Sequence, residues 1–270
     1  MQHSPRHGKI LQLLSREGVI GVAELARRLQ VSAETLRRDV RAMARRGEVL
    51  RMHGSVGLPS VAGEAPFERR LRENRAAKEA IAHTAAATIR DGASVMLDSG
   101  TTTALLARAL RGHRRLTVVT NSSDIARTLA TLNGNKVYMA GGELRSDDGA
   151  ALGHAAIEFV RRFRVDHAII SAGAVNCESG VLDHAFEEAE FGRAVLACGR
   201  RRVVVTDNSK FGRPGLVRVC GLADIDELIA EAPPPADLAA ALKAAGTALR
   251  LGDETPAAGT SRPSPGAAPA

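Results

Sequence analysis

The sequence predicts a small α+β domain at the N-terminus, followed by a larger α/β domain with a largely parallel sheet. Its length of 270 residues suggests about two domains. Apolar residues have helical spacing in the first 46 positions, whereas short apolar runs alternate with helical patterns from about Ile81 onward. The segment GLPSVAG at 57–63, between the two patterns, has the composition of a linker.

The stretch from Val31 to Arg46 predicts a helix with one buried face and one basic face. Ser32 is a good N-cap because its hydroxyl can accept a backbone N–H of the first turn, and Glu34 suits the positive end of the helix dipole. The apolar positions form one buried stripe: Leu36, Val40 and Met43. Five arginines lie largely off it: Arg37, Arg38, Arg41, Arg45 and Arg46. Such a face is either solvated or turned toward an anionic partner.

The segments before this helix favour the anionic partner. Apolar residues from Val22 to Leu29 have the spacing of a short amphipathic helix, which ends two residues before Ser32. A further helix is expected around Ile10 to Leu14, ending near Gly18. Two helices joined by such a short turn form a helix-turn-helix, whose second helix enters the major groove of DNA.

A β-hairpin, or wing, is predicted after the basic helix, from Glu48 to Val56, with Gly54 in the turn. Residues 1–57 hold 11 Lys and Arg against 5 Asp and Glu, so they carry +6 of the formal net charge of +7. Charge concentrated in this way marks a module that contacts phosphates. We therefore predict a winged helix-turn-helix that binds double-stranded DNA. Its expected DNA-binding residues are Ser32, Glu34, Thr35, Arg37, Arg38, Arg41, Arg51 and His53.

Five short apolar runs predict the strands of the second domain: 94–97, 116–120, 136–139, 168–171 and 203–206. Helical patterns lie between several of them, such as 103–110 and 123–132, and 67–80 is expected to form one helix that bridges the domains. Strands that alternate with helices form a parallel sheet. In such sheets, ligands bind at the carboxyl ends of the strands, near a topological switch point.

Small and hydrogen-bonding residues follow each predicted strand. The turn Asp98–Thr103 (DSGTTT) opens a helix, where hydroxyls, backbone N–H groups and the helix dipole suit a phosphate; an ordinary N-cap explains the same residues. Lys210 is either a charge for that phosphate or a solvated loop lysine. The expected effector-binding residues are Asp98, Ser99, Gly100, Thr101, Thr102, Thr103, Asn121, Ser122, Gly141, Gly142, Gly173 and Lys210.

Composition sets further expectations. The three cysteines lack metal-site spacing and are expected to be structural thiols of a reducing cytoplasm. We expect no metal, and we expect no cofactor. We expect no membrane span, because no run of 18 apolar residues exists, and we expect no secretory signal. The expected domains are a DNA-binding domain at 1–57, a linker and bridging helix at 58–76, an effector domain at 77–252 and a disordered tail at 253–270.

Several motifs, in their order, resemble the DeoR family of bacterial transcriptional repressors over roughly residues 6–230. They are VSAETLRRD and the HG of the wing, PFERR followed by KEAIA, DSGTTT, VVTNS, GGELR and DNSKFG. The resemblance implies an operator-binding domain and a sugar-phosphate-sensing domain, similar to ribose-5-phosphate isomerase, that binds a phosphorylated sugar or polyol as inducer. Ser55 departs from the family, which usually has a second glycine there, and this puts the turn type of the wing in question.

The same residues favour a sensor over an enzyme. The strand end at 171–174 has no carboxylate where isomerase relatives carry acidic residues, and the carboxylates Glu187, Glu188 and Glu190 lie on a helix that needs polar residues anyway. The alternatives are a sugar-phosphate isomerase with an accessory DNA-binding domain and a basic architectural protein. GVLDH at 180–184 and EEAE at 187–190 resemble the glycerol-3-phosphate repressor subgroup, although such residues also cap and solvate helices.

The expected mechanism is a switch. The α/β domains hold a homo-oligomer, a dimer or a tetramer. Two recognition helices then meet successive major grooves about 34 Å apart, or farther apart if the linkers splay them. A phosphorylated effector at 100–103 and Lys210 favours a conformation that binds the operator poorly. We expect this to release repression of a carbohydrate or glycerol-3-phosphate catabolic operon.

Overall fold

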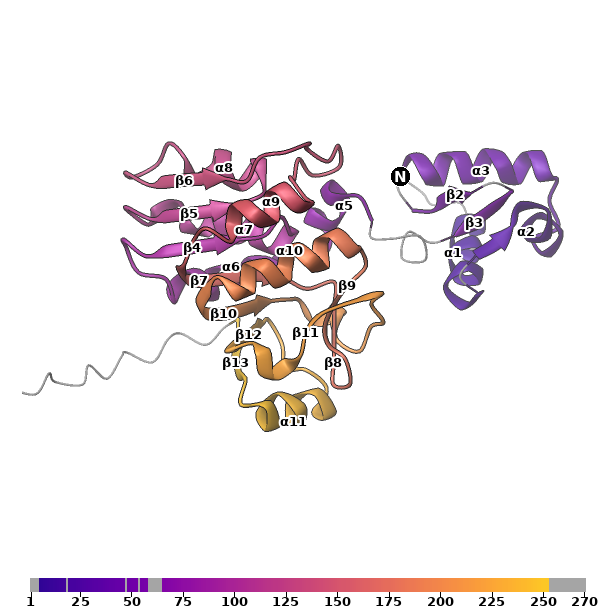
Figure 1. Ribbon diagram of the computed structural model, residues 1–270. Coiled ribbons are helices and arrows are strands. Elements are labelled where there is room, and N and C mark those ends of the chain that lie inside the picture. Colours follow the sequence, from indigo (N-terminus) through magenta and orange to yellow (C-terminus); the bar gives the residue numbers. More distant parts are fainter. Residues whose placement is uncertain (1–4, 18, 47, 53, 58–64, 253–270) are drawn as a thin grey trace, which may run out of the picture. The chain divides into compact units, whose positions relative to one another are not determined.

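The computed structural model describes residues 5–17, 19–46, 48–52, 54–57 and 65–252 (Figure 1). The chain divides into two compact units, residues 1–73 and 74–270. The expected disordered tail, residues 58–63 of the expected linker and the predicted DNA-binding residue His53 lie outside the described residues.

In the first unit, the described part of residues 5–57 forms three helices around a small sheet. The helices are α1 (Pro5–Glu17), α2 (Val22–Arg28) and α3 (Ala33–Arg45). The sheet is antiparallel, in the order β1-β3-β2, with β1 (Val19–Gly21), β2 (Leu50–Met52) and β3 (Ser55–Gly57). The predicted helices and hairpin are confirmed. The strand β1 was not predicted, because three residues are too short to show a period.

The basic helix α3 has the predicted cap and the predicted buried stripe. Ser32 is its N-cap, and the Ser32 side chain accepts a hydrogen bond from the Thr35 N–H at 3.1 Å. Leu36, Val40 and Met43 are buried in a core that also contains residues of α1, α2 and the sheet. This packing fixes which face of α3 remains outside, and that face carries the arginines.

The prediction of one continuous helix over 67–80 is wrong. The segment forms α5 (Phe67–Arg72) and α6 (Arg75–Ala87), and between them Asn74 has a left-handed backbone with φ of 52°. Asparagine enters this region at lower cost than most residues. The Asn74 amide donates to Asp207 Oδ1 at 2.9 Å and to Ser209 Oγ at 3.1 Å. A tertiary contact therefore overrides the local helical pattern.

The second unit is built on a seven-stranded sheet in which all neighbouring strands are parallel, as predicted. In sheet order the strands are β13 (Ala248–Leu251), β12 (Glu227–Ala230), β10 (Gly199–Val205), β7 (Val165–Ser171), β4 (Ser94–Leu97), β5 (Thr117–Thr120) and β6 (Lys136–Met139). All five predicted strands are present, and β12 and β13 extend the sheet beyond them.

Helices cover both faces of this sheet (Figure 1). One face carries α6, α7 (Thr101–Ala109) and α8 (Ser123–Leu129), and the other carries α9 (His154–Val160) and α10 (Phe186–Ala197). The helix α11 (Ala236–Ala245) precedes β13. A second, antiparallel sheet, which was not predicted, has the order β11-β9-β8, with β8 (Ala174–Asn176), β9 (Gly180–Asp183) and β11 (Val217–Cys220).

The strand order reverses between β4 and β7. The chain runs outward from β4 through β5 to β6, then returns to the other side of β4 as β7 and continues outward through β10, β12 and β13. The crevice for a ligand in such sheets lies where the order reverses, at the carboxyl ends of the strands. The turn Asp98–Gly100 after β4 and the end of β7 at Ser171 therefore lie at the switch point.

Gly100 is required by the close approach of these two strand ends. A Cβ atom at Gly100 would lie 1.8 Å from Ser171 Oγ and 2.6 Å from Ser171 Cβ. Distances this short cannot be relieved by a side-chain rotation alone, because the Cβ of Ser171 is fixed by its strand. The β4–α7 turn therefore packs directly against β7.

We expect Gly100→Ala to lower the free energy of unfolding by about 1–3 kcal/mol, the usual cost of overpacking. The matched control is Gly112→Ala, since a Cβ there meets no atom within 4 Å. Thermal and denaturant unfolding of both variants measure the effect. Equal stability of the two variants would show that the turn can move away from Ser171 without loss.

Candidate functional site

The residues predicted to bind an effector all lie at one edge of the large sheet. They follow five neighbouring strands, β10, β7, β4, β5 and β6. In that order, the strand ends carry Lys210, Gly173, Asp98–Thr103, Asn121–Ser122 and Gly141–Gly142. The alternation of strands and helices thus brings together residues that are more than 100 positions apart in the sequence.

Asp98 joins the two strands at the switch point. Its Oδ2 accepts hydrogen bonds from the Ser171 N–H at 2.8 Å and from Ser171 Oγ at 3.1 Å. Its Oδ1 accepts from Thr103 Oγ1 at 2.7 Å and from the Gly100 N–H at 3.2 Å. Burial raises the pKa of Asp98 to about 6, although the hydrogen bonds from Thr103, Ser171 and Gly100 favour the carboxylate. Four donors therefore hold this carboxyl group in place.

The three threonines at the start of α7 are buried, each at most 6% exposed. The Thr103 hydroxyl is occupied inside the turn, because it donates to Asp98. The N-cap of α7 is Gly100, which has no side chain to cap the helix. The first backbone N–H groups of a helix have no acceptor within the helix, and they form its positive end. The backbone of the first turn is therefore better placed to meet an anion than the Thr103 hydroxyl.

Asn121, after β5, has a buried acceptor without a partner. The residue is 0% exposed, and its Nδ2 donates to the Ala151 carbonyl at 3.0 Å and lies 3.5 Å from Ser99 Oγ. This contact fixes the orientation of the Asn121 amide, because a flipped amide would place Oδ1 against the Ala151 carbonyl oxygen. Asn121 Oδ1 has no hydrogen bond to any described residue. An unsatisfied buried acceptor costs about 1–3 kcal/mol, so this position suits a donor from outside the protein.

Of the remaining predicted residues, Ser122 and Gly173 make hydrogen bonds within the fold. Ser122 caps α8 by accepting from the Ile125 N–H at 3.3 Å. Gly173 donates its N–H to the Leu182 carbonyl at 3.1 Å. Gly141 and Gly142 are exposed. Lys210 is half-buried and ends a short 3-10 helix, Asn208–Lys210.

Sequence reasoning missed two cationic residues, Arg145 and Lys78. Arg145 donates to Asp148 through Nε at 2.9 Å and Nη2 at 2.5 Å, and its Nη1 lies 2.5 Å from Glu188 Oε1. These neighbours raise the pKa of Arg145, the hydrogen bond to Asp148 most of all. Lys78 on α6 is 4% exposed, which is rare for a lysine. Arg145 is the last residue of the GGELR motif at 141–145. A charged residue in a loop is usually solvated, so its place in the motif did not mark it as part of the site.

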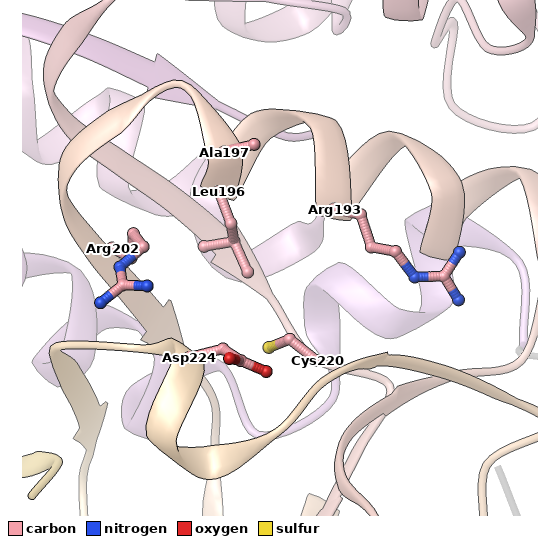
Figure 2. Close-up of a pocket in the computed structure, with 6 residues that line it drawn as sticks. All are labelled: Arg193, Leu196, Ala197, Arg202, Cys220 and Asp224. Atoms are coloured by element: carbon pink, nitrogen blue, oxygen red, sulfur yellow. The ribbon is translucent and has the colours of Figure 1, made fainter.

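A cavity of about 190 Å³ lies elsewhere in the second unit (Figure 2). It is lined by Arg193, Leu196, Ala197, Arg202, Cys220 and Asp224. The last turn of α10 forms one wall, so the cavity is remote from the carboxyl ends of the strands. Arg202 is bound to Asp226 through two hydrogen bonds of 2.9 and 3.1 Å, and burial raises the pKa of Cys220 to about 12. A protonated thiol is a poor nucleophile, and the Arg202 guanidinium is already paired with a carboxylate.

The outer face of α3 is basic. Arg37, Arg38, Arg41 and Arg45 are exposed. Glu34 lies 3.5 Å from Arg37 at the surface, where such a pair contributes little. Nearby carboxylates are engaged elsewhere: Asp39 binds Arg6 at 2.8 Å and Glu48 binds Arg46 at 2.6 Å. Within the part of the chain that the structure describes, Arg38 and Arg41 pair with no carboxylate.

The other predicted DNA-binding residues differ in their surroundings. Arg51 on β2 is exposed. Ser32 and Thr35 contact each other, with 2.9 Å between their hydroxyl oxygens, so the Ser32 hydroxyl serves the helix cap. On α2, Arg27 and Arg28 both bind Glu24, at 2.7 and 2.5 Å. Unpaired positive charge is therefore concentrated on α3 rather than on α2.

Membrane-spanning helices and metal clusters are both absent from the described residues. None of the helices in the described ranges is long and apolar enough to cross a membrane. Among the same residues, no group of three or more His, Cys, Asp or Glu side chains is arranged to hold a metal ion.

Comparison with known proteins gives two family matches. A DeoR-like helix-turn-helix domain matches residues 6–61, and the DeoR C terminal sensor domain matches residues 73–232. Relatives include the glycerol-3-phosphate regulon repressor of Escherichia coli (strain K12), 34% identical over 235 residues, which are 87% of this chain and 93% of that protein. The protein of the same name from Haemophilus influenzae is 36% identical over 228 residues, 84% of this chain and 89% of the relative.

Among solved structures, ribose 5-phosphate isomerase A from Neisseria gonorrhoeae aligns with a TM-score of 0.37 and 17% identity, covering 50% of this chain and 52% of that one. A similarity at this level transfers no activity. The sensor-domain match covers more than half of the chain, and the repressor relatives extend along most of it. The chain therefore belongs to the DeoR family of transcriptional regulators.

Proposed function

We propose that this protein represses a carbohydrate or glycerol-3-phosphate catabolic operon by binding operator DNA through α3 and the wing. The observation that carries this proposal is the exposed face of α3, where Arg38 and Arg41 have no carboxylate partner among the described residues. Their mutual repulsion is relieved when a phosphate backbone lies against them. The buried stripe of Leu36, Val40 and Met43 holds that face outward. A two-fold operator requires two such helices, so we propose at least a homodimer.

The effector is proposed to bind at the carboxyl edge of the sheet. The uncapped start of α7 suits a phosphate, and the orphaned Asn121 Oδ1 suits a hydroxyl of a sugar or polyol. The two features lie close together, since Asn121 Nδ2 is 3.5 Å from Ser99 Oγ. The names of the relatives make glycerol 3-phosphate the first effector to test.

We further propose that the site senses its ligand without transforming it. An aldose–ketose isomerase needs a positioned general base with a free lone pair. Asp98 has a raised pKa, but its carboxyl group already accepts four hydrogen bonds from Gly100, Thr103 and Ser171. The strand end at 171–174 adds no carboxylate. Asp98 is therefore suited to position the turn rather than to remove a proton.

The DNA interface is tested by the double variant Arg38→Ala with Arg41→Ala. The probe is a duplex selected by the wild-type protein from a random library. Each lost phosphate contact lowers the slope of log K against log salt by about 0.9, so we expect the slope to fall by about 2 and the affinity by more than tenfold. The control is Arg127→Ala with Arg161→Ala, which removes the same charge from exposed positions of the second unit. Equal binding by the two double variants would contradict the proposal.

The effector site is tested by Asn121→Ala in calorimetry with glycerol 3-phosphate. We expect the Kd to rise at least tenfold, since the ligand hydroxyl loses its acceptor, and about 1.4 kcal/mol corresponds to a factor of ten. Thermal unfolding of the same samples shows whether the variant is folded. A folded variant that binds as tightly as the wild type would remove Asn121 from the site.

The sensor assignment predicts no turnover of ribose 5-phosphate by the purified full-length protein. Ketose formation is followed by absorbance or by NMR, with a ribose-5-phosphate isomerase as the positive control. Turnover above the uncatalysed rate, abolished by Asp98→Asn, would identify an enzyme instead.

A further inference from the structure

We infer that Arg145 binds the phosphate of the effector, and that Glu188 of α10 occupies the same guanidinium group when no effector is bound. This inference rests on the proposed effector site and adds a residue and a coupling to it. The two side chains are joined by a contact of 2.5 Å between Arg145 Nη1 and Glu188 Oε1.

Arg145 lies on a loop, residues 141–151, that is fixed to the effector edge. The Ser123 N–H donates to the Gly149 carbonyl at 3.2 Å, and the Ala151 N–H donates to the Asn121 carbonyl at 2.9 Å. Gly149 has φ of +65°, and a Cβ there would lie 2.3 Å from Ser123 Oγ. The loop is therefore pressed against the start of α8, next to the orphaned Asn121 Oδ1.

Glu188 approaches from the opposite side of the switch point. It lies in the first turn of α10, which follows β9 and His184. A Cβ at Gly173 would lie 3.2 Å from His184 Cδ2, so the chain entering α10 passes beside the end of β7. The loop contacts the Asp98–Thr103 turn through Asn121 and Ser99, and α10 reaches it through Gly173 and Ser171. The Arg145–Glu188 pair thus connects the two segments that flank the turn.

The two carboxylate partners of Arg145 are unequal. The Asp148 side chain is 1% exposed, uses Nε and Nη2 of Arg145, and also accepts from the Ala150 N–H at 3.1 Å. Separating this pair would leave the buried Asp148 carboxylate without its counter-charge, which is strongly unfavourable. The Glu188 side chain is 20% exposed and bonds only Nη1. Asp148 therefore keeps Arg145 in position, while Nη1 is the donor that can change partner.

The charge around the turn gives a reason for the exchange. Asp98, Asp148 and Glu188 bring three carboxyl groups to a site that is proposed to bind an anion. A phosphate that replaces Glu188 on Nη1 keeps the charge-assisted hydrogen bond and moves one negative charge away from the site. A phosphate group carries about −1.5 to −2 charges at pH 7, against −1 for a carboxylate, so its single contact with Nη1 is at least as strong.

The exchange also makes the first turn of α10 sensitive to whether the effector site is occupied. The N-cap of this helix, Ala185, makes no side-chain hydrogen bond, so the Arg145–Glu188 contact is a side-chain anchor of the first turn. A bound phosphate removes that anchor, and the first turn of α10 becomes freer to move. The effector would therefore bind with different affinity to the conformation that has the Arg145–Glu188 contact and to the one that lacks it. Any ligand-driven switch requires such a difference in affinity.

The experiment compares Glu188→Gln with the matched control Glu187→Gln in the full-length protein. Both variants remove one charge from the first turn of α10, but Glu187 is exposed and hydrogen-bonds no described side chain. The probes are glycerol 3-phosphate, inorganic phosphate and glycerol, titrated by calorimetry. We expect Glu188→Gln to lower the Kd of the two phosphate probes about three- to tenfold relative to Glu187→Gln, with no change for glycerol.

A second pair of measurements guards against misfolding. Arg145→Lys keeps a charge for Asp148 but loses the second donor group, and we expect weaker binding of both phosphate probes. Hydrogen exchange of 186–190 in the wild type should rise on adding glycerol 3-phosphate, and it should be high without ligand in Glu188→Gln.

The outcomes separate the inference from the proposed function. Equal phosphate affinity in Glu188→Gln and Glu187→Gln overturns the exchange, and the proposed site stands if Asn121→Ala still weakens glycerol 3-phosphate. Tighter binding of glycerol as well as phosphate means a general loosening of the site, which also overturns it. A wild-type protein that binds neither glycerol 3-phosphate nor inorganic phosphate removes both proposals.

Discussion

The second unit depends on one carboxyl group, that of Asp98. Its two oxygens bind the end of β7 through Ser171 and the start of α7 through Gly100 and Thr103. Parallel strands at a switch point have no connecting turn between them, because their chain connections run in opposite directions. Backbone pairing of β4 with β7 ends at Leu97 and Ile169, and beyond it the Asp98 side chain continues the contact between the two strand ends. The uncapped start of α7, Asn121 and the 141–151 loop are all placed with respect to this junction.

Features of the fold that depend on residues close together in the sequence could be predicted. Ser32, the stripe of Leu36, Val40 and Met43, and the alternation of strands and helices obey local geometry, so the helix-turn-helix and the parallel sheet follow from the order of the residues alone. The strand ends could also be placed on one edge, because all parallel strands of a sheet end on the same side.

Features that depend on tertiary contacts were not predictable. Asn74 breaks a helical pattern because its amide binds Asp207, 133 positions away. In the sequence, Arg145 and Lys78 resemble ordinary surface charges. Folding gives Arg145 a buried carboxylate partner, Asp148, and buries Lys78. The strands β1 and β8 have only three residues each, which is too few to show a period, so only their pairing partners reveal them.

The span of the Asp98–Ser171 contact has a consequence for synthesis. The two residues are 73 positions apart. The helices α7, α8 and α9 and the strands β5, β6 and β7 must all be synthesised before the contact can form. The first unit has its own closed core and is finished much earlier, and domains fold in the order in which they leave the ribosome. A nascent or truncated chain thus presents its basic helix before the sensing edge exists. Because operator binding is proposed to need two such helices, such a chain would hold an operator only weakly and without control by an effector.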